Sequence, residues 1–200
     1  MRIGEIYINP SRDEYPENYQ HYFVNVNHKE LLRTGLTLKV AIENESTHIG
    51  VFHDDDIVSY VGLHREGPYN QIDMQCSQRE YRGQGYIRKC IEYAINHFTP
   101  VISDVGQTED AQQVWMALIQ RPNNIDYFWL NLDTNQQVPI KWVNGPTPNP
   151  WDETDEVVIL ALPRQTSAFI KEMRENRVAM DIKRNRRDPW LGPGFTEFNP

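Results

Sequence analysis

Apolar residues are frequent along several short stretches of this chain, and in 70–77 they alternate cleanly with polar residues, which predicts β-strands. The stretches are 36–44, two runs within 48–66 that flank Asp54–Asp56, 70–77, 100–104, 125–132, 138–143 and 156–163. Residues 1–9 alternate more loosely and are expected to add a short strand. In the stretch 70–77, Ile72, Met74 and Cys76 are expected to share one face. Asp73 is expected on the opposite face, together with Gln71, Gln75 and Ser77.

Apolar residues at helical spacing predict helices over 85–98 and 109–120, and an amphipathic helix over 166–187. One or two further helices are expected within 13–33, beginning near Pro16 and ending before Gly35. Residues 145–156 are expected to form a loop, because Pro, Gly and Asn are frequent there. The order of these elements predicts an α+β fold with one central mixed sheet.

The length of 200 residues fits one domain with a tail. We expect the domain over residues 1–165, followed by a basic helix and an irregular tail over residues 166–200. The aromatic residues of the tail leave two alternatives. They pack either on the body of the same chain or on a second subunit, which would make a homodimer; they are Trp190, Phe195 and Phe198.

The composition favours a globular protein without a membrane segment. Hydrophobic residues make up 39% of the chain, and no run of 18 apolar residues occurs. The first residues contain no apolar stretch typical of a secretory signal, so a cytoplasmic location is expected. The two Cys and the six scattered His match neither a disulfide framework nor a set of metal ligands, and no metal site is expected.

The charge of the chain is unevenly distributed. The formal net charge is -8, yet residues 163–200 hold eight Lys and Arg against five Asp and Glu. The acidic body argues against general affinity for nucleic acids. The basic run near the C-terminus is either a solvated helix end or a contact for a nucleic acid or an acidic partner. Its basic residues are Lys183, Arg184, Arg186 and Arg187.

The segment Arg82-Gly83-Gln84-Gly85 lies between the strand predicted at 70–77 and the helix predicted at 85–98. Glycines permit unusual backbone angles, and the first N–H groups of a helix lack internal partners and carry partial positive charge. The segment therefore predicts an anion site for a phosphate or pyrophosphate, to which Arg82 adds a charged contact. The alternative is that the glycines serve only the geometry of the turn.

Two nucleotide-binding motifs are excluded for this segment. It lacks the Gly-Lys-Ser/Thr sequence of a Walker A loop. Arg88 stands where the third glycine of a G-x-G-x-x-G motif would fall.

The same segment resembles the Arg/Gln-x-x-Gly-x-Gly/Ala loop of the GNAT superfamily of acyl-CoA-dependent N-acyltransferases, with matches at Arg82 and Gly85. The elements predicted over residues 48–120 also follow the order of that family. The resemblance implies a mostly antiparallel sheet whose fourth and fifth strands splay apart, and acetyl-CoA as the co-substrate.

The resemblance extends to small GNAT proteins carried by bacteriophages. In these, a pattern similar to Ser103-Asp104, Gln107-Thr108, Ala111 and Val114-Trp115 follows the fifth strand. For a phage-encoded protein, the expected location is the cytoplasm of the host.

The resemblance also implies a set of cofactor-binding residues. Backbone groups at the end of the fourth strand would hold the pantetheine arm as if adding a strand; they belong to Cys76, Ser77 and Gln78. The loop amides would hold the pyrophosphate; they belong to Arg82, Gly83, Gln84, Gly85, Tyr86 and Ile87. Trp115 would either wall the acyl pocket or belong to the core.

Attack of an amine on a thioester requires a base for the amine proton and stabilisation of the developing charge. Asp73 is the acid nearest to the position where the family often has a glutamate base. Its alternative role is that of a solvated strand residue. Asp104 is a second candidate base or amine anchor, and its alternative role is that of a turn residue.

Two residues depart from the pattern of the family. Ile87 replaces Gly or Ala at the end of the loop, and Trp115 stands four residues after Ala111, where many relatives have a Tyr that protonates the thiolate. Tyr86 or water would then be the proton donor, or the thiolate would leave as the anion.

Three hypotheses about function follow. The first is an N-acetyltransferase that acts on a primary amine. The second is a GNAT-shaped binding or inhibitor protein without catalytic activity. The third is an acyltransferase whose acceptor is a nucleic acid, either a modified base or an aminoacyl-tRNA.

Overall fold

The computed structural model describes residues 15–33, 35–151 and 156–165. The chain divides into the units Met1–Pro163 and Arg164–Pro200, and the elements described below belong to the first unit. The strand expected at 1–9, the helix expected at 166–187, the basic run and the tail aromatics lie outside the described residues. No helix within the described ranges has the length and apolar character needed to cross a membrane.

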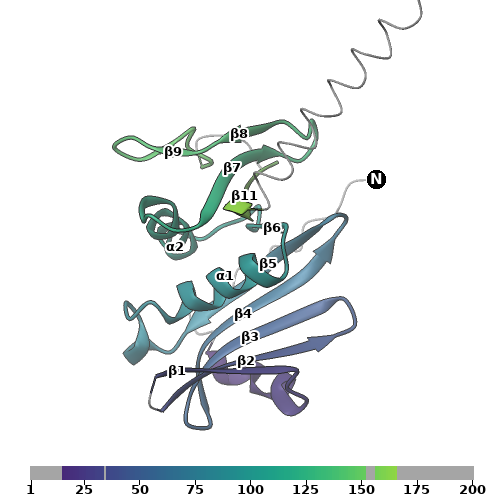
Figure 1. Ribbon diagram of the computed structural model, residues 1–200, viewed down its shortest axis with the longest axis vertical. Helices are drawn as coiled ribbons and strands as arrows, with labels where there is room; N and C mark the ends of the chain where they lie inside the picture. The colour runs from purple at the N-terminus through teal and green to yellow at the C-terminus, as the bar shows by residue number, and fades with distance from the viewer. Residues whose placement is uncertain (1–14, 34, 152–155, 166–200) are drawn as a thin grey trace, which may run out of the picture. The chain divides into compact units, whose positions relative to one another are not determined.

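A nine-stranded sheet forms the centre of the first unit, with the strand order β1-β2-β3-β4-β5-β6-β11-β7-β8 (Figure 1). Its strands are β1 (His28–Arg33), β2 (Leu36–Glu43), β3 (Ser46–His53), β4 (Asp56–Glu66), β5 (Tyr69–Ser77), β6 (Val101–Ile102), β7 (Ile125–Asn131), β8 (Gln137–Pro139) and β11 (Val157–Pro163). β5 and β6 are parallel, and the other neighbouring pairs are antiparallel. The predicted α+β fold with a mixed, mostly antiparallel sheet is therefore confirmed.

Helices cover both faces of this sheet. α1 (Tyr86–His97) and α2 (Glu109–Gln120) lie on one face, where Ile91 and Trp115 belong to the larger core. The 3-10 helix η1 (Pro16–Val24) lies on the other face, where Phe23 packs against Phe52 in a second core. Figure 1 shows α1 in front of the sheet and η1 behind it. We call the second face the η1 face.

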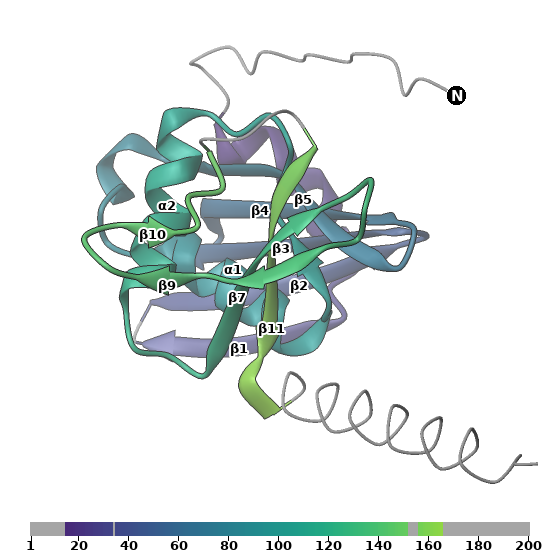
Figure 2. The ribbon, with the colours of Figure 1, turned by 90° about the horizontal axis from the view of Figure 1, so that it is seen from above.

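A small separate sheet pairs β9 (Lys141–Trp142) with β10 (Pro146–Thr147). It lies beside α2 (Figure 2). The stretch 138–143, expected to be one strand, is thus divided between β8 and β9. β8 ends at Pro139, and one residue further the Ile140 N–H still donates to the Tyr127 carbonyl of β7 at 2.9 Å.

The helices expected within 13–33 are only partly correct. η1 begins at Pro16, as expected, but His28–Arg33 forms the edge strand β1, which pairs with β2. Most side chains of β1 are exposed, so the sequence carries little of the alternation that marks a half-buried strand. The conformation of β1 is determined by backbone pairing with β2 and not by the spacing of its own side chains.

A β-bulge at Asp73 changes the alternation expected for β5. Leu63 of β4 pairs with Ile72, but the next residue, Gly62, pairs with Met74, so that Asp73 is the extra residue. Ile72 packs in the core beneath α1, whereas Met74 and Cys76 pack against the core of the η1 face. The expectation that these three apolar residues share one face is therefore wrong beyond Ile72.

Candidate active site

β5 and β6 pair over a very short length. Asn70 pairs with Val101 and Gln71 pairs with Ile102, and the ladder then ends. β5 continues to Ser77, so its second half has an edge to which no described strand is paired. This is the splay that the resemblance implies between the fourth and fifth strands of the family, which correspond here to β5 and β6.

The unpaired edge of β5 leads directly into the glycine loop. The backbone N–H of Gln78 donates to the Val58 carbonyl of β4 at 3.0 Å. Backbone groups of successive strand residues point to alternate sides, so Ser77 directs its own N–H and C=O toward the unpaired edge. Cys76, like Gln78, directs its backbone toward β4. Arg82 Nε donates to the Ser77 carbonyl at 3.3 Å and so joins the loop to the strand.

The start of α1 is not capped by a side chain. Its N-cap residue is Gly85, at φ 82° in the left-handed region, and Gly83 precedes it at φ 76°. Among the described residues, the backbone N–H groups of Gly83, Gly85 and residues 86–88 have no hydrogen-bond acceptor. Free N–H groups and the partial positive charge of a helix start are the features that an anion site at this place requires.

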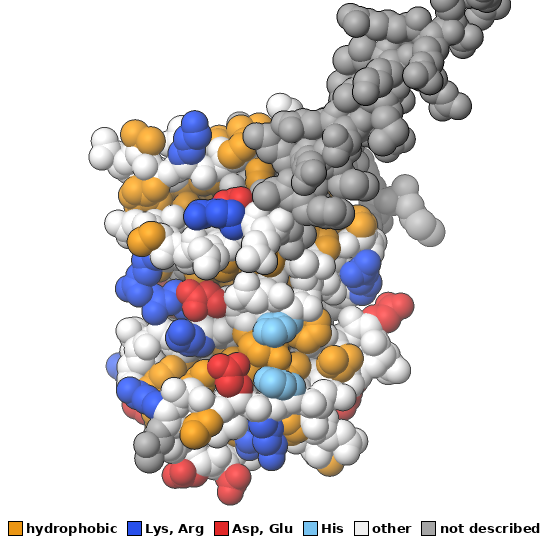
Figure 3. Space-filling view, in the orientation of Figure 1, with side chains coloured by type: hydrophobic (Ala, Val, Ile, Leu, Met, Phe, Trp, Pro, Cys, Tyr) orange, Lys and Arg blue, Asp and Glu red, His pale blue; other side chains and the backbone are white. Residues whose placement is uncertain are grey.

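Basic side chains surround this helix start. Figure 3 shows Lys and Arg side chains gathered toward the N-terminal end of α1. A Cβ atom on Gly85 would lie 2.9 Å from Arg88 Nη2, so the Arg88 guanidinium lies directly over this glycine. The arrangement suits a ligand with several negative charges.

Tyr86 and Ile87 both direct their side chains into the protein. The buried Tyr86 hydroxyl donates to Gln84 Oε1 at 2.9 Å and accepts a hydrogen bond from Arg33 Nη2. Ile87 packs against the core beneath α1. Because its side chain is used in this packing, Ile87 does not fill the loop, although it is larger than the Gly or Ala of the resembling family.

Trp115 is only 1% exposed and belongs to the same core. Of its two expected roles, the structure places it in the role of a core residue. Its indole group has no acidic proton to give to a thiolate.

The two candidate acids both lie on the η1 face. Asp73 Oδ2 lies 3.3 Å from His64 Nδ1, and Asp104 Oδ1 accepts a hydrogen bond from Gln71 Nε2 at 3.0 Å. His64 and Gln71 face each other across the β4–β5 ladder. The cross-strand pair His64–Gln71 therefore connects Asp73 with Asp104. Asp104 Oδ1 also accepts from the Val105 N–H at 2.7 Å, so Asp104 is a turn residue as well.

A buried tyrosine and histidine lie beside Asp73. The Tyr60 hydroxyl is 2.8 Å from His48 Nδ1. Burial raises the pKa of Tyr60, and the nearby charge of Asp73 acts in the same direction. A Cβ atom on Gly62 would lie 2.8 Å from the Tyr60 hydroxyl and 2.9 Å from Asp73 Oδ1. Only glycine at this position leaves room for both groups.

Sequence reasoning did not identify His64, His48 or Tyr60. One signal for His64 was available, because counting back from the tight β4–β5 turn places it opposite Gln71. No such signal existed for His48, because its neighbours on β4 and η1 become neighbours only in the folded protein.

No protein-family model matches this chain. No curated protein matches it either. Two solved structures are similar at low identity. The ribosomal-protein-S18-alanine N-acetyltransferase from Escherichia coli is 11% identical, with a TM-score of 0.36 over 61% of this chain and 71% of that one. A GNAT family acetyltransferase from Elizabethkingia anophelis with acetyl-CoA bound is 14% identical, with a TM-score of 0.33 over 60% of this chain and 76% of that one.

Proposed function

We propose that this protein is an N-acetyltransferase that transfers the acetyl group of acetyl-CoA to a primary amine by direct attack. One observation carries the proposal: in the part of the chain that the structure describes, the unpaired edge of β5 leads into a helix start whose N–H groups have no acceptor. A pantetheine arm contains amides and can add to such an edge as a further strand. A pyrophosphate suits the free N–H groups of the loop and the helix start.

The residues on the η1 face supply the proton chemistry. Asp73 is exposed and accepts the proton of the attacking amine, and His64 stabilises the carboxylate and passes the proton to solvent. Acetyl-CoA supplies the electrophilic thioester carbonyl. The nitrogen–carbon bond forms, the carbon–sulfur bond breaks, and the amine proton goes to the Asp73–His64 pair.

The thiolate leaves without a tyrosine acid in this proposal. Trp115 lies in the core, and the Tyr86 hydroxyl is engaged by Arg33 and Gln84. A thiol with an ordinary pKa of about 8.5 is a good enough leaving group to depart as the anion.

Calorimetric titration with acetyl-CoA tests the binding step. We expect the wild type to bind and Gly85→Asp to bind at least about tenfold more weakly, because the new carboxylate repels the pyrophosphate and displaces Arg88. Gly67→Asp is the matched control, because Gly67 also has a positive φ of 55° but lies in the β4–β5 turn with open space around it. Absence of binding by the wild type would contradict the proposal.

Release of the free thiol in the presence of a panel of primary amines tests the transfer step. We expect acetyl-CoA-dependent release with at least one amine, and the acetylated amine in the mass spectrum. Tight binding of acetyl-CoA without transfer to any amine would instead support the second hypothesis, a binding protein. The third hypothesis, a nucleic-acid acceptor, depends on basic residues outside the described part of the chain.

A further inference from the structure

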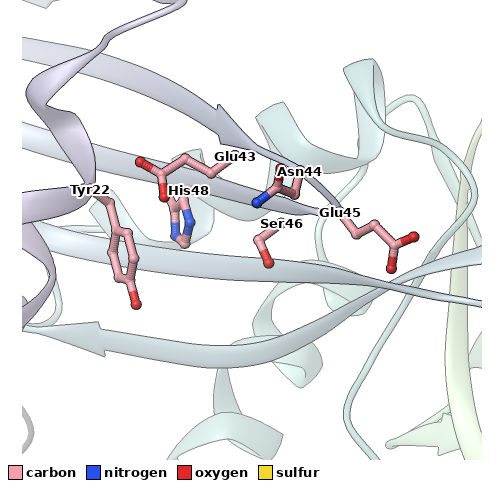
Figure 4. Close-up of a pocket in the computed structure, with 6 residues that line it drawn as sticks. All are labelled: Tyr22, Glu43, Asn44, Glu45, Ser46 and His48. Carbon is pink, nitrogen blue, oxygen red and sulfur yellow. The ribbon is translucent and has the colours of Figure 1, made fainter.

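A hollow of about 490 Å³ opens on the η1 face beside the β2–β3 turn. It is lined by Tyr22, Glu43, Asn44, Glu45, Ser46 and His48. Figure 4 shows Glu43 beside the ring of His48, Tyr22 next to that ring, and Glu45 at the far end. The lining contains carboxylates, an amide, a hydroxyl and two aromatic rings, but neither Lys nor Arg.

The aromatic wall of the hollow is formed by the half-buried Tyr22 and the buried His48. The rings of Tyr22 and His48 are stacked, with centroids 3.8 Å apart and an interplanar angle of 4°. His48 is 6% exposed and is fixed at Nδ1 by the Tyr60 hydroxyl, while its Nε2 has no hydrogen-bond partner among the described residues. Burial lowers the pKa of His48, so the imidazole is uncharged near neutral pH and does not compete for the carboxylates.

The carboxylates of the hollow, those of Glu43 and Glu45, have no ion-pair partner in the part of the chain that the structure describes. Arg65 is near, but it contacts Glu45 through the backbone, where its N–H donates to the Glu45 carbonyl at 3.1 Å. Carboxylates next to an aromatic face form a site that favours an organic cation.

The hollow lies on the same face as the proposed base. Ser46 pairs with His64 and His48 pairs with Gly62, so the lining residues of β3 are one strand away from the groups that hold Asp73. Glu43 lies beside the His48 ring (Figure 4), and the charges of Glu43 and Asp73 both raise the pKa of His48, against the larger effect of burial. Glu43 is the last residue of β2 and pairs with Ser46 of β3, so it is three strand spacings, or about 14 Å, from Asp73 on β5.

We propose that the hollow binds a second ammonium group of the acceptor, so that the acceptor is a diamine or polyamine. Its reacting amine lies at Asp73 while a second cationic nitrogen, about 14 Å away, meets Glu43. This inference rests on the N-acetyltransferase function proposed above, because Asp73 marks the reacting end.

The test compares 1,10-diaminodecane with decylamine as acceptors for the full-length protein at saturating acetyl-CoA. We expect the KM of the diamine to be at least about tenfold lower, the effect of one charge-assisted hydrogen bond. Glu43→Gln should remove this difference by raising the KM of the diamine alone, with kcat unchanged. Glu45→Gln should have a smaller effect, and Asp56→Asn, which removes a charge beyond the other end of β3, should have none.

Calorimetric titration of the diamine into the protein is the second measurement, and it needs no turnover. Binding weakened about tenfold by Glu43→Gln supports the inference. Equal KM values for the two amines, or diamine binding that Glu43→Gln leaves unchanged, would overturn it. If monoamines are acetylated and the diamine gains nothing, this inference fails alone. If acetyl-CoA does not bind, the proposed function fails.

Discussion

Asp73 Oδ2 lies 3.3 Å from His64 Nδ1, and the two residues come from neighbouring strands that meet at a β-bulge. Asp73 and Met74 together oppose Gly62, so an aspartate and an apolar residue share one place in the ladder. The absence of a side chain on Gly62 leaves space for the Asp73 carboxylate and the Tyr60 hydroxyl. A bulge and a glycine thus hold a carboxylate–imidazole pair on the η1 face.

Replacing Asp73 by Asn should lower kcat by about 100-fold or more, which is the usual contribution of a positioned base. The dissociation constant of acetyl-CoA should not change, because Asp73 lies on the η1 face and the glycine loop lies beyond the end of β5. Thiol-release kinetics and calorimetry measure the two quantities. Asp56→Asn is the control for removal of a charge. An unchanged kcat in Asp73→Asn would remove Asp73 from the proposed mechanism.

Replacing Gly62 by Ala should misplace Asp73 without altering its chemistry. The new Cβ atom would lie 2.9 Å from Asp73 Oδ1 and 2.8 Å from the Tyr60 hydroxyl, so one of them must move. A displacement of that kind costs up to about 100-fold in kcat. Adding Tyr60→Phe removes one of the two close contacts and should restore part of the lost rate. If the double variant is no faster than Gly62→Ala, crowding is not the cause.

Most of the fold could be predicted from residues that interact with near neighbours in the sequence. The amphipathic stripes of α1 and α2 and the apolar runs of β2, β7 and β11 predicted their positions to within one or two residues. β1 could not be predicted, because its exposed side chains carry no pattern and its conformation depends on pairing with β2. The bulge at Asp73 was not visible either, since one extra residue depends on the register of the partner strand.

In the candidate site, too, some residues could be identified from the local sequence and others only from the pairing of strands. The loop could be predicted from Gly83 and Gly85, because both have left-handed backbone angles that favour glycine whatever the rest of the fold. Asp73 and Asp104 were identified as acids, but Gln71 and His64, which connect them, required the β4–β5 register.

Substitution of Trp115 tests whether this departure from the resembling family affects the binding of acetyl-CoA or only the packing of the core. Trp115→Ala should lower the free energy of unfolding by about 3–5 kcal/mol, because it leaves a large cavity in the core. Trp115→Phe should cost less and leave the dissociation constant of acetyl-CoA unchanged. Denaturant unfolding and calorimetry provide the two readouts. Weaker acetyl-CoA binding by Trp115→Phe at unchanged stability would show that Trp115 walls the acyl pocket instead.

The buried His48 should make the stability of the protein depend on pH in a defined direction. Burial lowers its pKa from the ordinary 6.5, with Glu43 and Asp73 opposing the shift less strongly. As the pH falls below about 6.5, the unfolded chain binds a proton at His48 before the folded protein does, so the free energy of unfolding decreases until the lower folded pKa is passed.

The variant His48→Gln cannot bind this proton. Comparing it with the wild type therefore separates the pH dependence caused by His48 from that caused by the other five histidines. We therefore expect the wild type to lose more of its thermal midpoint than His48→Gln between pH 7.5 and pH 5.5, measured by differential scanning calorimetry. A difference between the two proteins that stays constant with pH would show that His48 titrates normally. If the thermal midpoint of the wild type instead falls less than that of His48→Gln at low pH, the folded protein binds the His48 proton more tightly than the unfolded chain. The charges of Glu43 and Asp73 would then outweigh the effect of burial on the pKa of His48.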